Sequence, residues 1–291
     1  MRARVPLWRG ERPGDGGVVR LVWRTLRAVF RLARVVGHGL HGLAIVGLWY
    51  PTLNEAGRHA RIAWWAAGLL RALGMRLQVQ DNPRPGAKLI VANHVSWLDI
   101  MAIHAVCPQA RFVSKADVRR WPLVNRLVDA AGTLYLEREN RRDALRVVHQ
   151  MADALAIGQT VAVFPEGTTS DGRTLLPFHA NLLQAAIVQA IPVQPVALRY
   201  ADAEQPISAA TRYVDNVSLA RSLWWLACGE GLVVHVHLLP ALGSAHAERR
   251  ALAARARQAI ADELLPHGCQ PRPALTAPAL TAEAAPPEPA A

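Results

Sequence analysis

The sequence has few of the residues that build disulfide frameworks or cysteine-based metal sites. Its three cysteines stand apart without C-x-x-C spacing, and their number is odd: Cys107, Cys228 and Cys269. We therefore exclude a disulfide framework and a cysteine zinc site, and we expect a reducing cytosolic setting. Lysine is scarce as well, because only Lys88 and Lys115 occur among the 33 lysines and arginines.

Apolar runs long enough to cross a bilayer are also scarce. The stretch VVGHGLHGLAIVGLWYP carries two histidines and ends at Pro51, whereas a full span needs about 20 predominantly apolar residues. It is a marginal span or a hairpin-like insertion, and whether residues 35–50 cross the bilayer stays open. A cleaved secretory signal is not expected, because no A-x-A-like site follows the stretch.

Positive charge is abundant and concentrated at one end. The net charge is +11, which points to a nucleic acid, a membrane surface or a phosphorylated substrate. Residues 2–34 hold nine arginines and two acids. Within VVRLVWRTLRAVFRLARVV, the basic residues recur every three or four positions opposite an apolar side, as expected of an amphipathic helix lying on an anionic membrane. The alternative is an ordinary helix with a solvated face.

The sequence pattern changes at Met75, where short β-rich runs begin to alternate with helical ones. This pattern predicts an α/β fold, with a mixed, mostly parallel sheet flanked by helices and preceded by a membrane-associating helical segment. We expect a flexible basic N-terminus over 1–17, membrane-associating helices over 18–74 and the enzymatic domain over 75–265. The Pro- and Ala-rich residues 266–291 are expected to be a disordered tail.

In open α/β sheets, ligands collect beyond the carboxyl ends of the strands. His94 follows the apolar run AKLIVA, and Asp99 comes five residues later. If His94 lies in the turn before a helix capped near Ser96, the carboxylate can reach back to one ring nitrogen and leave the other as a general base. Ser96 is a competing nucleophile, although a serine at this position is usually an N-cap.

A second loop with chemical potential follows the run TVAV. FPEGTTSDG offers backbone N–H groups and hydroxyls that can hold a phosphate or another oxyanion, and Glu166 can orient a neighbouring donor or the substrate. A plain turn uses the same residue types. From this loop alone, function and structure are equally favoured.

Four blocks together resemble one known family. NHVSWLD matches the NHxxxxD signature of the glycerolipid (lysophospholipid) acyltransferases, and FPEGT matches their second hallmark. GTLYLER is similar to their G-x-x-F-x-x-R block, and IPVQPV is similar to their V-P-x-x-P-V block. The blocks occur in the family's order over roughly residues 75–240.

The resemblance implies that His94 acts as general base on the hydroxyl of a lysolipid, oriented by Asp99. The acyl group would come from a thioester of coenzyme A or acyl carrier protein, with no cofactor, metal or nucleic acid. The positions that match the family's acceptor-binding residues are Lys115, Arg138, Glu166, Gly167 and Thr168. The expected acceptor is 1-acyl-sn-glycerol-3-phosphate, which would give phosphatidic acid at the cytoplasmic face of a bacterial inner membrane.

One departure from the family concerns the acceptor. Thr169 stands where the phosphatidic-acid-forming members usually have arginine, and FPEGTTSDG followed by LPF resembles the lyso-ornithine lipid acyltransferases. Lyso-ornithine lipid is therefore the alternative acceptor.

Two other classes of protein remain as alternatives. His235 and His237 share one face of a strand and could form a hydrolase metal site with His94, His104 or Asp99. The chain could also be a membrane scaffold that has lost catalysis.

Overall fold

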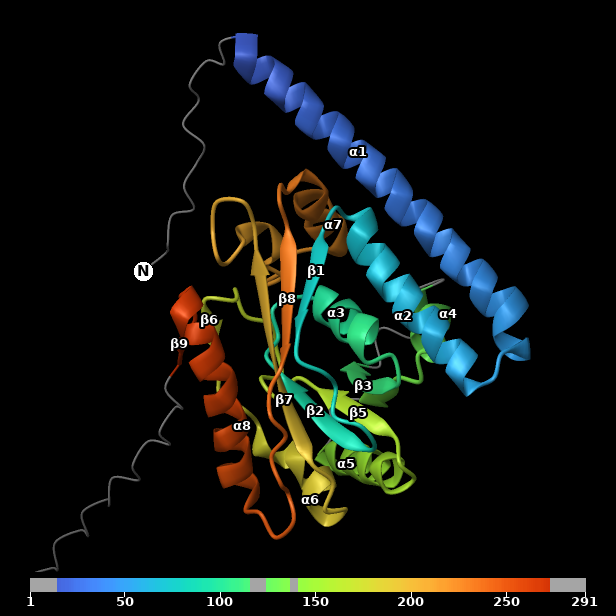
Figure 1. Cartoon of the computed structure of the whole chain (residues 1–291), viewed down its shortest axis with the longest axis vertical. Helices are drawn as coiled ribbons and strands as arrows, with labels where there is room; N and C mark the ends of the chain where they lie inside the picture. The colour runs from blue at the N-terminus through green and yellow to red at the C-terminus, as the bar shows by residue number, and fades with distance from the viewer. Residues whose placement is uncertain (1–14, 116–123, 137–140, 273–291) are drawn as a thin grey trace, which may run out of the picture.

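The computed structural model describes residues 15–115, 124–136 and 141–272 (Figure 1). At its centre lies a seven-stranded sheet in the order β1-β8-β7-β2-β5-β3-β4. Neighbouring strands are parallel except for the antiparallel pair β7 and β8. The predicted mixed, mostly parallel sheet is therefore confirmed. Its strands are β1 (Arg76–Gln80), β2 (Lys88–Ala92), β3 (Ala110–Lys115), β4 (Leu134–Leu136), β5 (Thr160–Val163), β7 (Val193–Ala201) and β8 (Val233–Leu238).

Helices cover both faces of the sheet. On one face pack α2 (Glu55–Ala72), α3 (Leu98–Val106) and α7 (Leu219–Cys228). On the other face pack α5 (Arg141–Ala156), α6 (Gln184–Val188) and α8 (Arg249–Leu264). Successive residues of β2 point to opposite cores: Ile90 and Ala92 face α3, while Leu89 and Val91 face α5. A strand buried on both faces reads as a continuous apolar run, which is why KLIVA shows no alternation.

The N-terminal segment forms the long helix α1 (Asp15–Ala44), continued by η1 (Ile45–Trp49) and η2 (Tyr50–Thr52). Figure 1 shows α1 in blue along one side of the molecule, next to α2 and α7. Arg31 anchors it by donating to the carbonyl oxygens of Ala227 and Gly229 at 3.0 and 2.6 Å. The ring of Trp65 stacks on His38 of α1, with 5.4 Å between centroids, whereas Trp64 is 40% exposed.

Order extends beyond the boundary expected at residue 266. The helical turn η6 (Leu265–His267) is followed by β9 (Gln270–Pro271), which pairs with β6 (Thr174–Leu175). Backbone hydrogen bonds make this pairing, so a composition argument based on side chains did not predict it.

Residues 273–291 and 1–14 lie outside the described part of the chain, and α1 already begins at Asp15. The remaining elements are α4 (Val124–Ala130), η4 (Ala180–Leu183) and η5 (Ala209–Thr211).

Candidate active site

His94 stands at the carboxyl end of β2. The preceding residue, Asn93, prolongs the contact between β2 and β7 with its side chain: Nδ2 donates to the Leu198 carbonyl at 2.9 Å, and Oδ1 accepts from the Leu198 N–H at 2.8 Å. Asn93 is buried. These two bonds fix where the sheet ends, so His94 starts the turn from a defined position.

The Asp99 carboxylate reaches back to the imidazole, as the spacing predicted. His94 Nδ1 and Asp99 Oδ2 are 2.7 Å apart. The same oxygen accepts from the backbone N–H groups of Val95 and Ser96 at 2.7 and 2.9 Å. Asp99 is fully buried, and a buried carboxylate is tolerable only when such donors satisfy it. The Asp99 side chain therefore both stabilises the turn and orients the His94 ring.

Tyr200 completes the environment of this carboxylate, and sequence reasoning missed it. Tyr200 lies on β7, and its hydroxyl donates to Asp99 Oδ1 at 2.6 Å. This is the carboxylate oxygen that His94 does not contact. Burial raises the pKa of Tyr200, and the neighbouring Asp99 raises that pKa further, so the phenol keeps its proton. The available signal was only an aromatic residue in an apolar strand, which ordinarily indicates core packing.

The other side of the imidazole is shaped by the FPEGT loop. The His94 ring stacks on Phe164, with 4.1 Å between centroids and 8° between planes. The side chain keeps 20% of its surface exposed. Among the described residues, Nε2 has no hydrogen-bond partner. Because Nδ1 is held by Asp99, Nε2 is the nitrogen free to exchange a proton with a bound molecule.

Glu166 ties the two motif loops together. One carboxylate oxygen accepts from the His94 N–H at 2.7 Å, and the other accepts from the Leu176 N–H at 2.9 Å. The Ser170 N–H donates to the His94 carbonyl at 2.8 Å, which adds a third link. Glu166 therefore orients a neighbouring donor, one of the two roles considered for it. Its predicted contact with substrate stays a prediction.

The rest of the FPEGT loop combines a left-handed turn at glycine with an exposed tip. Gly167 has φ +71°, in the left-handed region that favours glycine. Thr168 is exposed, so its hydroxyl is accessible to a ligand. Thr169, which replaces the family's arginine, turns its hydroxyl to the Tyr213 carbonyl. Its side chain therefore supports the neighbouring loop.

Two predicted binding residues are only partly placed. Lys115 is the last residue of β3, and its backbone pairs with Leu136 of the parallel strand β4. The carboxyl end of β3 lies at the same sheet edge as that of β2, because both strands run parallel to β5. The side chain of Lys115 and the whole of Arg138 lie outside the described residues, so their binding roles stay predictions.

The structure supports neither of two alternative chemistries, a Ser96 nucleophile or a metal site that joins His235 and His237 to the dyad. Ser96 is fully buried, and its hydroxyl accepts from the Leu98 N–H at 3.4 Å near the start of α3. His235 and His237 point to the α8 side of the sheet, opposite the α3 side that holds His94 and Asp99. Within the described ranges, no cluster of three or more His, Cys, Asp or Glu side chains could hold a metal ion.

We expect the stability of the protein to decrease with rising pH because of Glu166. Burial raises the pKa of its carboxyl to about 8 from an ordinary 4.5, against the two N–H donors, which lower it. The fold therefore holds the proton more tightly than the unfolded chain does, and this contribution to stability is lost between those two pH values. The free energy of unfolding should fall from about pH 5 to about pH 8 in the wild type relative to Glu166→Gln.

Denaturant unfolding at several pH values measures this difference. Glu248→Gln is the matched control, because the α8 N-terminal backbone N–H groups lower the pKa of Glu248 and its titration lies below this window. Parallel stability curves for the wild type and Glu166→Gln would contradict the assignment.

Comparisons with known proteins identify the family of the chain. The sequence model of the family described as acyltransferase matches residues 75–199. The chain is 35% identical to a lyso-ornithine lipid O-acyltransferase of Pseudomonas aeruginosa, over 81% of this chain and 92% of that protein. It is 38% identical to a 1-acyl-sn-glycerol-3-phosphate acyltransferase of Neisseria meningitidis, over 63% of this chain and 72% of that protein.

A solved structure has the same fold. The crystal structure of the 1-acyl-sn-glycerophosphate acyltransferase of Thermotoga maritima superposes with a TM-score of 0.66, covering 85% of this chain and 97% of that one, at 19% identity. The motif blocks, the fold and the share of each chain covered by the alignments all indicate the same family. The chain therefore belongs to the glycerolipid (lysophospholipid) acyltransferase family, and it is an acyltransferase.

Proposed function

We propose that the protein transfers a fatty acyl group from an acyl thioester to the free hydroxyl of a lysolipid. One observation carries the proposal: the buried Asp99 holds His94 by Nδ1 at 2.7 Å, while the imidazole stays partly exposed. This arrangement supplies a general base, and Ser96, the candidate nucleophile among the described residues, is fully buried. The arrangement suits direct attack by a substrate hydroxyl better than it suits a covalent acyl-enzyme.

The reaction then takes two proton transfers. His94 Nε2 removes the proton from the lysolipid hydroxyl as its oxygen attacks the thioester carbon, and Asp99 stabilises the imidazolium that forms. When the tetrahedral intermediate collapses, the C–S bond breaks and the imidazolium returns the proton to the departing thiolate. The donor is the thioester of coenzyme A or of acyl carrier protein. We propose that no metal or further cofactor takes part, because base and leaving group account for every proton.

For the acceptor, we propose 1-acyl-sn-glycerol-3-phosphate, whose product is phosphatidic acid. The relative from Neisseria meningitidis carries this activity in its name. Lys115 and Arg138 are proposed to bind the acceptor's phosphate, and the exposed Thr168 with Gly167 to shape its site beside Glu166. The carboxyl ends of β2 and β3 at one sheet edge support this placement for Lys115.

A specific observation favours lyso-ornithine lipid as the second candidate acceptor. Thr169 removes a potential phosphate ligand from the loop, and its hydroxyl is already bonded to Tyr213. The Pseudomonas aeruginosa relative named for this activity aligns over most of both chains. The chemistry at His94 would be the same for either acceptor.

We propose that α1 attaches the enzyme to the cytoplasmic face of a bacterial inner membrane. Its free side exposes large apolar side chains, among them Val19, Val22, Leu26, Val29, Phe30, Val36 and Leu40. By length and composition Val19–Thr52 could also span a bilayer. However, the bonds from Arg31 to α7 and the packing of Trp65 against His38 hold α1 along the domain. We therefore propose that α1 lies in the membrane interface.

Acyl transfer should depend on His94. General base catalysis contributes about 10² to 10⁴ in rate, so His94→Ala should lower turnover by at least about 10² with the fold intact. The assay is thiol release from an acyl thioester by detergent-solubilised protein, with 1-acyl-sn-glycerol-3-phosphate and lyso-ornithine lipid as competing acceptors. The control is His149→Ala, an exposed histidine of α5.

The two acceptors separate the outcomes. Faster release with 1-acyl-sn-glycerol-3-phosphate supports the main proposal, whereas preference for lyso-ornithine lipid replaces it with the second candidate. A loss of only a few-fold in His94→Ala would remove the general-base role.

Tyr200→Phe should change the pH–rate profile as well as the rate. The lost bond to a charged carboxylate, about 1.5–3 kcal/mol, loosens the position of Asp99 and therefore of His94, and this misplacement should lower kcat/KM by roughly 10- to 100-fold. Without the phenol, the Asp99 carboxylate has one hydrogen-bond donor fewer and interacts more strongly with the imidazolium. The acid limb of kcat/KM should therefore move to higher pH. A lower rate with an unmoved acid limb would indicate a purely structural role for Tyr200.

Membrane binding should depend on the free side of α1. The double variant Leu26→Ser/Phe30→Ser removes two side chains that are 57% and 63% exposed in the structure. We expect about tenfold or greater weakening of binding to anionic vesicles, since burying each such side chain in lipid contributes about 1.5–3 kcal/mol. Sedimentation with vesicles measures it.

The matched control is Ile157→Ser/Val188→Ser, which removes two apolar side chains that are 73% and 64% exposed and lie far from α1 along the chain. Equal weakening in both double variants would contradict a specific role for α1.

A further inference from the structure

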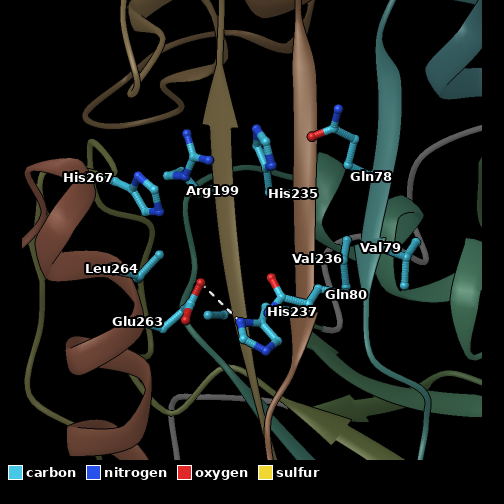
Figure 2. A pocket seen from close by; sticks show the side chains of 11 residues that line it. Gln78, Val79, Gln80, Arg199, His235, Val236, His237, Glu263, Leu264 and His267 are labelled. Atoms are coloured by element: carbon cyan, nitrogen blue, oxygen red, sulfur yellow. Dashed lines mark ion pairs between the residues drawn. The ribbon is translucent and has the colours of Figure 1, made fainter.

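A polar groove lies on the face of the sheet opposite the dyad. It has a volume of about 570 Å³ and runs over β1, β8 and β7 beside the end of α8. Figure 2 shows its polar side chains pointing into one space from these elements. Successive side chains of β7 point to opposite faces of the sheet, which separates the groove from the dyad: Tyr200 turns to Asp99, while Arg199 turns into the groove. None of the residues that line this groove takes part in the proposed acyl transfer.

The two carboxylates near the groove, Asp81 and Glu263, both pair with the imidazole of His237. His237 lies between two acids: Nε2 is 2.9 Å from Asp81 Oδ2, and Nδ1 is 3.0 Å from Glu263 Oε1. Figure 2 draws the ion pair between His237 and Glu263 below the other groove residues. Each acid therefore has a partner, and the negative charge is gathered at this end.

The opposite end gathers basic groups. Figure 2 shows Arg199 in a row with His235 and His267. One guanidinium N–H group donates to the Pro206 carbonyl at 2.9 Å, and within the described part of the chain the other N–H donors of Arg199 have no hydrogen-bond partner. Neither imidazole of the row has a hydrogen-bond partner among the residues that the structure describes. Three basic side chains with spare donors thus face a cavity.

We infer that Arg199, His235 and His267 bind a soluble anion of the phosphate class, such as a phosphomonoester, in this groove. A planar guanidinium matches the oxygens of phosphate, and two imidazoles supply further donors to the same group. The cavity volume is ample for a small phosphorylated molecule. The ligand's remaining part would contact Gln78 and the apolar side chains of Ala197 and Leu264.

Burial and the neighbouring basic groups both act on the two imidazoles of the row. Burial lowers the pKa of His235 to about 4, and Arg199 and His267 lower it further. Burial also lowers the pKa of His267, Arg199 adds to this effect, and Glu263 opposes it. A bound anion would relieve this repulsion and favour the protonated imidazoles.

The position of the groove favours a soluble source over a lipid headgroup. Figure 1 shows α8 on the far side of the sheet from α1, the helix proposed to lie on the membrane. An anion in the lipid surface beneath α1 would be separated from the groove by the sheet and its helices. The ligand therefore reaches this site from solution.

Isothermal titration calorimetry with inorganic phosphate tests the site on the full chain in a phosphate-free, nonionic detergent. We expect saturable binding that weakens by about tenfold or more in Arg199→Gln, because charge-assisted bonds are lost. His235→Gln should weaken it too, and this variant leaves the bond to Pro206 in place. Arg255→Gln, an exposed arginine of α8 outside the groove, is the matched control for charge removal.

A second arm uses sulfate, whose charge is constant between about pH 5.5 and pH 8, so that only the protein titrates. Because anion binding favours protonated His235 and His267, sulfate should bind several-fold more tightly at the lower pH. His237, Asp81, Glu263 and Arg199 also face this region, so His235→Gln is used to isolate the contribution of the imidazole of the row.

The outcomes separate this site from the catalytic one. Acyl transfer is measured in parallel, and the groove variants should retain it. Binding that survives Arg199→Gln but is lost in Arg138→Ala would place the anion at the acceptor site and overturn the inference, as would the absence of saturable binding. Binding of phosphatidic acid in nanodiscs, dependent on Arg199 but without binding of inorganic phosphate, would overturn the soluble ligand.

Discussion

The buried carboxylate of Asp99 is the constraint on which the site depends. It accepts hydrogen bonds from the His94 ring, from two N–H groups of the following turn and from Tyr200. A fully buried carboxylate without these donors would cost several kcal/mol or take up a proton. The donors come from the end of β2, the approach to α3 and the strand β7. The same group that orients the base therefore also joins the elements that carry it.

The parallel sheet explains why motifs far apart in the chain meet at this carboxylate. β2 lies between β5 and β7, so the segments that follow β2 and β5 leave the sheet at the same edge. Glu166 converts this adjacency into a fixed distance by accepting from the His94 N–H, and Ser170 donates back to the His94 carbonyl. The FPEGT loop thus sets the position of the histidine backbone, while Phe164 sets the plane of its ring.

Local spacing predicted the contact between His94 and Asp99 because both residues belong to one turn, whose geometry short-range sterics limit. Tyr200 could not be predicted in this way, since it lies on another strand and its role depends on the registry of β7 with β2. Strand and helix alternation predicted the sheet, but backbone pairing of β9 beyond residue 266 left no side-chain signal. The pair His235 and His237 was predicted on one strand face, whereas packing of α8 decided which face it was.

Adjacent residues of β7 connect both sides of the sheet. Tyr200 bonds to the dyad, and Arg199 points into the polar groove. An occupant of the groove could alter the dyad only by displacing β7, which is hydrogen-bonded to β2 along one edge and to β8 along the other. Such a central strand resists displacement, because moving it breaks two ladders at once. The alternation that places a polar site behind the catalytic one therefore also insulates the two sites from each other.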